Sequence, residues 1–350
     1  MGKEADNGLK VAMVTPWGKS VRCGIRTYSE ALVGSLAELG VDVYVVRLPR
    51  FGIMMPDIMK FVAGSVPEEV DLVHVQHEYG LFKNLEGVFY GVEGLKMKGK
   101  PVVSTLHAVG NFSVDQILAK DSDVLITHNE FCSKRLGHPN VIIPHGCAPA
   151  KCLPSAEAKK SYGLRLEWPI IGYLGFISNY KGLETLIEAM EKISTAGLLI
   201  GGGWHVEGET GYIAKLKQYS FEALPGRVHW LGYVKDEDLH RAYGSMDIFV
   251  YPSRYATESG ALLTALSYGK ATIASRIGPF KSKEKEGALV TFKGVNSLRR
   301  RIRKLLRDRE AHRELEEGAR SYAESVSWPK VARLHVSLYD DVIERKSAER

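Results

Sequence analysis

Three side chains in this sequence have types and positions that could support chemistry on a bound ligand. His107 follows a predicted strand, Lys181 stands just before a predicted helix, and Glu258 precedes Ser259-Gly260 at another predicted helix start. A fixed ammonium such as that of Lys181 stabilises negative charge on a leaving phosphate. A helix start offers unpaired N–H groups and a positive dipole end, which also suit a phosphate. The alternatives are a solvated loop charge for Lys181 and a buried, hydrogen-bonded ring for His107.

The elements that must position these residues alternate between strand and helix. Residues 251–275 contain the end of an apolar strand, a stop at Pro252, a polar loop, a helix over 261–268 and a closing Gly269. Apolar runs predict strands over residues 10–15, 41–46, 70–76, 101–106, 123–127, 141–143, 169–174, 197–200, 228–231, 248–251 and 271–274. This alternation predicts a doubly wound α/β fold, in which ligands bind at the carboxyl ends of the strands.

In the first half, several polar residues fall at predicted strand ends. Gly24 lies between the first strand and a helix over residues 25–39, where the missing Cβ permits either close approach to a ligand or a tight turn. One histidine after a strand is ordinary, but a group of polar residues at one sheet edge favours a site. The group comprises His77, Glu78, His107 and His145.

A stretch rich in Pro, Lys and Ala at residues 148–161 predicts a linker between two such halves. We therefore expect one domain over 1–152 and a second over 153–327, with a final helix over 328–350. Neither half contains G-x-G-x-x-G or G-x-x-x-x-G-K-[ST], which argues against nicotinamide chemistry and P-loop NTP hydrolysis. Acidic residues 236–238 are predicted to start a helix, with Asp236 as its cap, rather than to bind a metal.

Composition indicates an ordinary globular protein. The 350 residues are 45% hydrophobic and 25% charged, and no apolar run reaches the roughly 18 residues of a membrane helix. The polar, charged start is unlike a signal peptide, so we expect a cytoplasmic protein. The cysteines lack C-x-x-C spacing and are predicted to be reduced structural thiols: Cys23, Cys132, Cys147 and Cys152.

The formal net charge of +6 is modest, but residues 298–308 (LRRRIRKLLRD) are intensely basic. Two interpretations stay open for the Arg299–Arg307 segment: a solvated helix face, or a face that contacts lipid headgroups at a membrane. No nucleic-acid-binding motif accompanies it, so we expect no nucleic-acid partner.

Over nearly its whole length the chain resembles a GT-B glycosyltransferase of the retaining GT4 family, also called glycosyl transferases group 1. The segments that carry the resemblance keep the family's order and spacing: residues 23–28 (CGIRTY), 71–80, 101–107, 143–146 (IPHG), 172–189 with Lys181-Gly182, 227–243 and 251–275. The resemblance implies two Rossmann-like domains facing each other across a cleft, the final helix crossing back to the first. It further implies a nucleotide-diphosphate sugar as co-substrate, no cofactor, no essential metal and front-face attack.

The resemblance also assigns roles to residues. His107, Lys181 and Glu258 would be catalytic, with His107 at the donor sugar. The nucleotide sugar would contact Gly24, Gly175, Phe176, Lys181, Gly232, Tyr233, Glu258, Ser259, Gly260, Ala261, Leu262 and Thr264. His77 and Glu78 are expected on the acceptor side or in structural roles.

Two departures from the family pattern concern the donor site. The positions of the paired signature glutamates are occupied by Ala256 and Thr264, and Glu258 is the expected substitute for the first of them. Phe176 stands where the family has an arginine, so one phosphate-binding charge is missing or comes from elsewhere, from Arg254 or Lys19.

These observations predict a hexosyltransferase that uses a GDP- or UDP-linked donor and a carbohydrate or lipid-linked acceptor. Two alternatives remain because the signature glutamates are missing. One is a GT-B-shaped phosphorylase or epimerase. The other is a catalytically weak nucleotide- or sugar-binding protein, such as a partner subunit.

Overall fold

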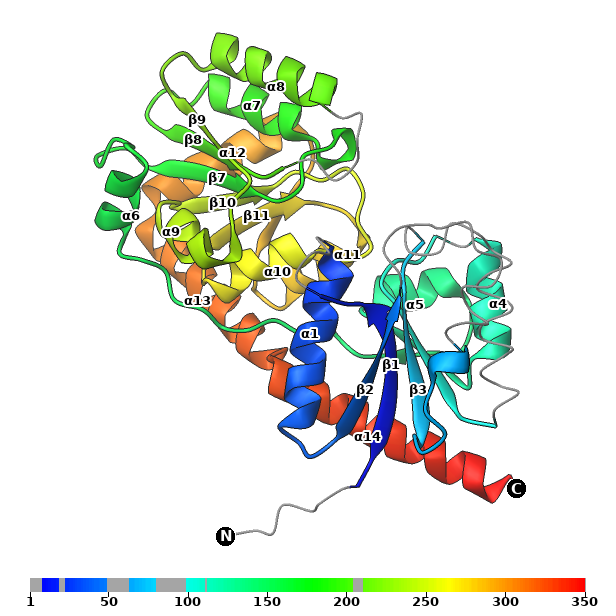
Figure 1. Cartoon of the computed structure of the whole chain (residues 1–350). Coiled ribbons are helices and arrows are strands. Elements are labelled where there is room, and N and C mark those ends of the chain that lie inside the picture. The colour runs from blue at the N-terminus through cyan, green and yellow to red at the C-terminus, as the bar shows by residue number, and fades with distance from the viewer. Residues whose placement is uncertain are drawn as a thin grey trace. The chain divides into compact units, whose positions relative to one another are not determined.

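The computed structural model describes residues 8–18, 23–48, 63–79, 99–110, 112–203 and 210–349. The chain divides into two compact units (Figure 1). Unit 1 comprises residues 1–146 and 326–350, and unit 2 comprises residues 147–325. The sequence placed these boundaries at 152 and 327. Lys19, one of the two proposed replacement charges, lies outside the described residues.

Unit 1 contains a parallel six-stranded sheet with the order β2-β1-β3-β4-β5-β6. Its strands are β1 (Lys10–Pro16), β2 (Asp42–Leu48), β3 (Leu72–His77), β4 (Val102–Leu106), β5 (Val124–Thr127) and β6 (Val141–Ile142). Every residue of β3 and β4 is buried, as expected where helices cover both faces of a parallel sheet. The strand order reverses between β1 and β3, so the ends of these two strands form a topological switch point.

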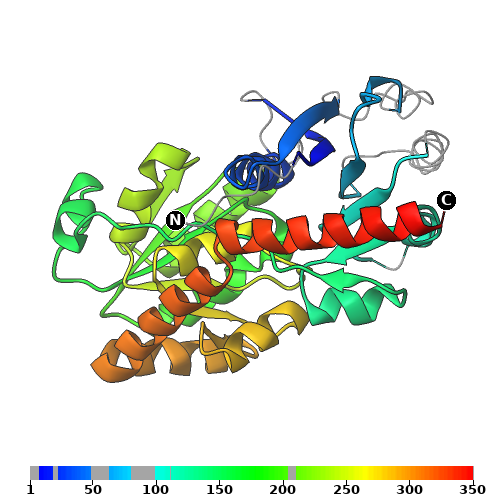
Figure 2. The same ribbon diagram turned by 90° about the horizontal axis from the view of Figure 1, so that it is seen from below.

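The helices of unit 1 are α1 (Gly24–Ala37), α4 (Ser113–Asp121), α5 (Glu130–Leu136) and α14 (Trp328–Ala348). α14 is the long terminal helix in red in Figure 2. Its apolar residues Val331, Ala332 and Tyr339 share one core with Tyr28 and Leu32 of α1. The last helix therefore completes the core of unit 1, although some 180 residues separate it from the rest of that unit.

Unit 2 contains a second parallel six-stranded sheet, with the order β12-β11-β10-β7-β8-β9. Its strands are β7 (Ile170–Leu174), β8 (Gly197–Gly201), β9 (Val228–Gly232), β10 (Ile248–Tyr251), β11 (Ala271–Ser275) and β12 (Val290–Phe292). The helices are α6 (Ser155–Ser161), α7 (Leu183–Glu191), α8 (Thr210–Ala223), α9 (Leu239–Gly244), α10 (Gly260–Ser267), α11 (Gly278–Lys285), α12 (Val295–Arg307) and α13 (Arg309–Ser325), with 3-10 turns at η1 (Asn179–Lys181) and η2 (Asp236–Asp238). Here the order reverses between β10 and β7.

Local sequence explains most of these elements. α7 buries Leu183, Leu186, Ile187 and Met190 on the face that the sequence predicted. Gly269 follows α10 with φ of 65°, a conformation that favours glycine. The predicted cap at Asp236 was wrong: Asp236 begins the 3-10 turn η2, and α9 starts after Asp238 without a side-chain cap. Across the described residues, no helix has the length and apolar character needed to cross a membrane.

Candidate functional site

The candidate site of unit 2 lies at its switch point, where β7 and β10 end. Gly175 follows β7, and its N–H donates to the Gly201 carbonyl at the end of β8 (3.1 Å). Gly202 in turn donates to the Gly232 carbonyl at the end of β9 (2.7 Å). A Cβ placed on Gly175 would lie 3.4 Å from the Cβ of Ala261, so the first turn of α10 packs directly against the end of β7. Predicted residues from three loops therefore meet at one edge of one sheet.

The first turn of α10 leaves two backbone donors unsatisfied. A helix start has N–H groups without intrahelical acceptors. Ser259 N–H donates to Oε1 of Glu258 (2.9 Å), and Leu262 N–H donates to Oγ of Ser259 (3.2 Å). The N–H groups of Gly260 and Ala261 have no acceptor among the described residues. Two adjacent N–H groups at a helix start form an anion-binding position.

Lys181 provides a positive charge at the same edge. Its ammonium donates to the hydroxyl of Tyr251, the last residue of β10 (2.7 Å), and lies over the rings of Tyr180 and Tyr251. Burial alone would lower the pKa of Lys181. Interactions with Tyr251 and Tyr180 raise the pKa by more than burial lowers it, so the net pKa lies above its ordinary value. No carboxylate of the described residues forms an ion pair with this lysine, and its charge is available to an anionic ligand.

Glu258 is buried in an ion pair. Its Oε2 lies 2.8 Å from Nζ of Lys283 on α11, and both side chains are 5% exposed or less. Burial alone would lower the pKa of Lys283, but the Glu258 carboxylate more than offsets this, and the net pKa is raised. Through Oε1 and the Ser259 N–H, the pair also fixes the start of α10. The catalytic role assigned to Glu258 stays a prediction.

We expect Glu258→Gln and Lys283→Met each to lower the free energy of unfolding of unit 2 by about 3 kcal/mol, because each leaves a buried charge without its partner. The double variant E258Q/K283M should recover most of that loss, since it removes both charges. Urea unfolding followed by the hydrogen-exchange protection of peptides from unit 2 would measure this. A double variant as unstable as the sum of the singles would contradict a direct pairing.

The other predicted donor-site residues surround this edge. Tyr233 is half exposed after β9, and Phe176 is partly buried after β7. The Thr264 hydroxyl donates to the Gly260 carbonyl one turn earlier (2.8 Å). The guanidinium of Arg254 bonds Asn179 and forms an ion pair with Glu184 (3.2 Å), so this candidate second charge is already partnered.

In unit 1 the structure connects polar residues of β3 with histidines that follow β4 and β5. Nε2 of His107 lies 2.8 Å from the side-chain amide of Gln76, and Nδ1 lies 3.1 Å from Nε2 of His128. Nδ1 of His128 lies 3.1 Å from the Ile143 carbonyl. The same amide of Gln76 also reaches Nε2 of His74 (3.1 Å), whose Nδ1 contacts the hydroxyl of Tyr339 (2.6 Å). These bonds form a continuous chain that is buried except at His107, which is partly exposed.

Two oxygens in this network can only accept hydrogen bonds. The Ile143 carbonyl accepts from Nδ1–H of His128, and Oε1 of Gln76 accepts from Nε2–H of His107. The amide nitrogen of Gln76 lies against Nε2 of His74 and Sδ of Met13. Burial, and then the neighbouring histidines, hold the pKa of His107 well below its ordinary value. Both ring nitrogens of His107 have protein partners. A hydrogen bond from His107 to a sugar would have to replace one of these bonds, and the sugar contact stays a prediction.

Gly24 begins α1, with open space where a Cβ would be. Five predicted residues belong to unit 1, and the other predicted residues with described positions belong to unit 2. The five are Gly24, His77, Glu78, His107 and His145. The sequence missed Tyr251, Lys283, Gln76 and His128. Tyr251 was detectable as the polar end of a strand. The sequence around Lys283, GPFKSKEK, has no pattern that distinguishes a buried lysine from an exposed one.

Among the residues with described positions, no three His, Cys, Asp or Glu side chains gather in a metal-binding arrangement.

One known family matches the second half of the chain. Residues 154–322 match the family described as glycosyl transferases group 1. A sulfoquinovosyl transferase from Arabidopsis thaliana is 31% identical over 169 residues, which are 46% of this chain and 31% of that protein. A glycogen synthase from Desulfitobacterium hafniense is 25% identical over 190 residues, which are 50% of this chain and 39% of that protein. The chain thus spans well under two thirds of the length of these curated relatives.

Solved structures resemble the chain over nearly its full length. Sucrose-phosphate synthase from Thermosynechococcus elongatus superposes with a TM-score of 0.80 at 19% identity, covering 96% of this chain and 100% of that one. HepE from Anabaena, in complex with UDP and glucose, gives 0.77 at 16% identity, with 95% and 100% coverage. At such identities the likeness shows the fold. It confirms the predicted fold class, GT-B, built from two doubly wound α/β halves.

Proposed function

Because residues 154–322 of this chain belong to the group 1 glycosyl transferases, we propose that the protein is a retaining glycosyltransferase. It moves a hexose from a GDP- or UDP-linked donor to the hydroxyl of a carbohydrate or lipid-linked acceptor. Unit 2 binds the donor, and unit 1 supplies the acceptor side together with His107. The crystallised complex of HepE with UDP and glucose supports a nucleotide-sugar donor for a protein of this fold.

One observation carries the proposal. The N–H groups of Gly260 and Ala261 and the ammonium of Lys181 lie at the same switch-point edge, and within the described part of the chain neither N–H has an acceptor and the ammonium has no carboxylate partner. A nucleoside diphosphate leaves with increased negative charge on its terminal phosphate. Preorganised donors and a fixed cation stabilise that charge more in the transition state than in the ground state. The proposal therefore needs no metal ion at the diphosphate.

The reaction we assign is front-face displacement. The bond between the sugar C1 and the phosphate oxygen breaks while the acceptor oxygen bonds C1 from the same side. The acceptor proton moves to the departing phosphate. No side-chain nucleophile is required, which agrees with a Glu258 carboxylate that is paired with Lys283.

Gly260 offers a sharp test of the phosphate position. Gly260→Pro removes one free N–H at the first helical position, where proline is well tolerated, and no heavy atom lies within 4 Å of the position of a Cβ. We expect affinity for the donor nucleoside diphosphate to fall about tenfold or more, since a hydrogen bond to a charged group is lost. Calorimetry with a panel of nucleoside diphosphates would identify the base and measure the loss.

Gly260→Ala is the matched control, because it adds a similar Cβ and keeps the N–H. It should bind the nucleotide like the unmodified protein. Equal affinity of the proline and alanine variants would place the phosphate elsewhere, and silence toward every nucleotide would overturn the proposed function.

A second candidate function rests on the signature positions. Ala256 and Thr264 offer no carboxylate, and the Thr264 hydroxyl already donates to Gly260, so ribose and sugar have fewer ligands than in a standard family member. A nucleotide-binding subunit with weak catalysis is consistent with that. Release of free nucleoside diphosphate when acceptor is added would identify the enzyme, and binding without release would favour the subunit.

A further inference from the structure

α12 carries an unbalanced positive charge. Its 13 residues (VNSLRRRIRKLLR) include five arginines, one lysine and no acidic residue. The whole chain has 47 basic and 41 acidic residues, so the charge of this one helix equals the formal net charge of the whole chain, +6. The rest of the sequence is balanced.

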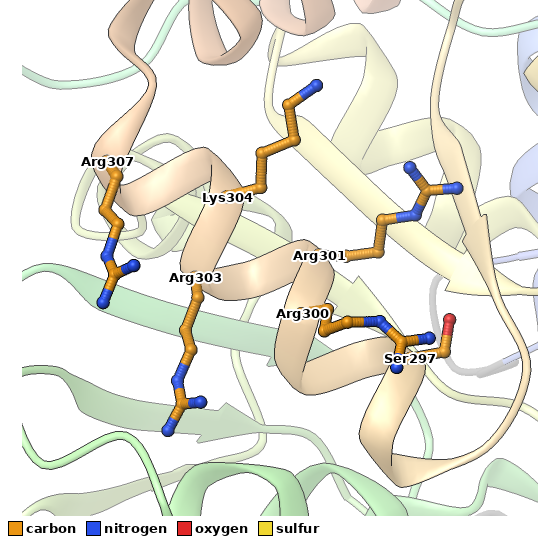
Figure 3. Close-up of a pocket in the computed structure, with 6 residues that line it drawn as sticks. All are labelled: Ser297, Arg300, Arg301, Arg303, Lys304 and Arg307. Carbon is orange, nitrogen blue, oxygen red and sulfur yellow. The ribbon is translucent and has the colours of Figure 1, made fainter.

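The charge lies on the outward side of the helix. Leu298, Ile302 and Leu305 are buried in the core of unit 2. The opposite side carries the side chains that we call the cationic face: Arg300, Arg301, Arg303, Lys304 and Arg307. Figure 3 shows them fanning out from the helix, with Arg303 and Arg307 to one side and Arg301 and Lys304 to the other. With Ser297 they line a shallow pocket of about 550 Å³.

Some of the basic residues of α12 have a structural role. Arg299 donates to the carbonyl of Glu188, and Arg303 donates to that of Lys192 (2.6 Å), so both attach α12 to the end of α7. Arg300, Lys304 and Arg307 have no such bonds among the described residues. They follow one another at spacings of four and three, so their like charges repel and weaken the helix.

The next helix shows how the same unit balances charge elsewhere. On α13, Arg313 pairs with Glu310 (2.7 Å) and Arg320 pairs with Glu316 (3.7 Å). In contrast, no carboxylate with a described position forms an ion pair with any basic residue of α12. Arg300, Lys304 and Arg307 are therefore charges of the cationic face to which the described structure assigns no partner.

We propose that the cationic face of α12 docks on an anionic membrane surface by contact with lipid phosphates. The cationic face is solvent-exposed along a helix about 20 Å long, and such a length can contact several lipid headgroups at once. It contains no aromatic side chain on which nucleic-acid bases could stack. The exposed large apolar side chains of unit 2 all lie outside α12, so the face also lacks the apolar anchors of a protein interface: Leu166, Tyr180, Phe221, Tyr233 and Tyr255. The proposal is independent of sugar transfer.

Co-sedimentation of the full chain with vesicles tests this. The protein should sediment with phosphatidylcholine vesicles that contain phosphatidylglycerol, and not with phosphatidylcholine alone. Binding should weaken as salt rises. Each cation near an anionic surface contributes about fivefold in affinity, so the triple variant R300Q/K304Q/R307Q should bind on the order of 100-fold more weakly. It should unfold about as easily as the unmodified protein, because the relief of like-charge repulsion offsets the loss of two cations from the last turn of α12.

The control K134Q/K160Q/K215Q removes the same charge from three exposed lysines on other helices. It should keep most of the binding. Equal loss in both triple variants would assign the effect to net charge and overturn the proposal. The proposal would also be overturned if the unmodified protein failed to bind anionic vesicles. This holds whether or not a single-stranded oligonucleotide captured the protein.

Discussion

Lys181→Met is expected to lower the rate of sugar transfer by about 100-fold or more. Among the described residues, this ammonium is the one cation at the switch point of unit 2 without a carboxylate partner. It donates a hydrogen bond to the Tyr251 hydroxyl (2.7 Å). Loss of a single preorganised group that stabilises developing negative charge typically costs 100- to 1,000-fold in turnover. Methionine keeps the apolar stem against the rings of Tyr180 and Tyr251, so the fold should be retained. Steady-state release of nucleoside diphosphate measures the effect.

Two further variants separate charge from packing. Tyr251→Phe removes the hydroxyl that holds the ammonium but keeps the ring, and should cost much less than the loss of the charge itself. Lys215→Met, on exposed α8, should leave turnover unchanged. If Lys181→Met transferred sugar as fast as the control, the leaving phosphate would not lie at this lysine.

Much of the fold followed from the sequence because its strands are continuous apolar runs. β3, β4, β7 and β10 are buried at every position and matched predicted strands to within two residues at each end. β12 and α11 were missed. β12 has three residues, and GPFKSKEK in α11 has no apolar periodicity, so neither carries a pattern that can be recognised without its neighbours.

The candidate site was predictable as a set of loops but not as a set of bonds. Gly175, Lys181 and Gly260 could be assigned to one edge because parallel strands bring their carboxyl ends together. The pairing of Glu258 with Lys283, 25 positions away, could not be foreseen, because it depends on the path of a helix that the sequence did not reveal. The same holds for His107: a histidine after a strand was visible, whereas its bonds to Gln76 and His128 arise from the lateral order of β3, β4 and β5.

Buried neutral histidines are expected to make unit 1 unfold in mild acid. Four histidines of this unit have lowered pKa values: His74, His77, His107 and His335. Burial is the main cause in each case, because it disfavours the charged ring. The histidines with described positions in unit 2, His229, His240 and His312, are all partly exposed. Acid should therefore act on unit 1 first.

The sign follows from proton uptake. Above the ordinary histidine pKa of 6.5, folded and unfolded chains both hold these rings neutral, and the full stability is present. Below pH 6.5 the histidines of the unfolded chain bind protons, whereas those of folded unit 1 stay neutral. The free energy of unfolding therefore falls with pH until the pKa of the folded state is reached. For His77 and His335 that value is about 4, a cost of about 3 kcal/mol each. His74 and His107 add to it, and domains are stable by only about 5–15 kcal/mol. Unit 1 should unfold between pH 6.5 and 4.

Hydrogen exchange across that pH range, corrected for the intrinsic rate, would measure the effect unit by unit. Peptides containing β3 and β4 should lose protection at a higher pH than peptides containing β7 and β10. His335→Phe is the informative variant. Nε2 of His335 is buried with no partner among the residues whose positions are described, and Nδ1 donates to the Val331 carbonyl within α14. Phenylalanine removes both the unsatisfied atom and one titrating ring, so protection of unit 1 should persist to lower pH. If the two units lost protection together, or if His335→Phe left the midpoint unchanged, the buried histidines would not set the acid limit of this protein.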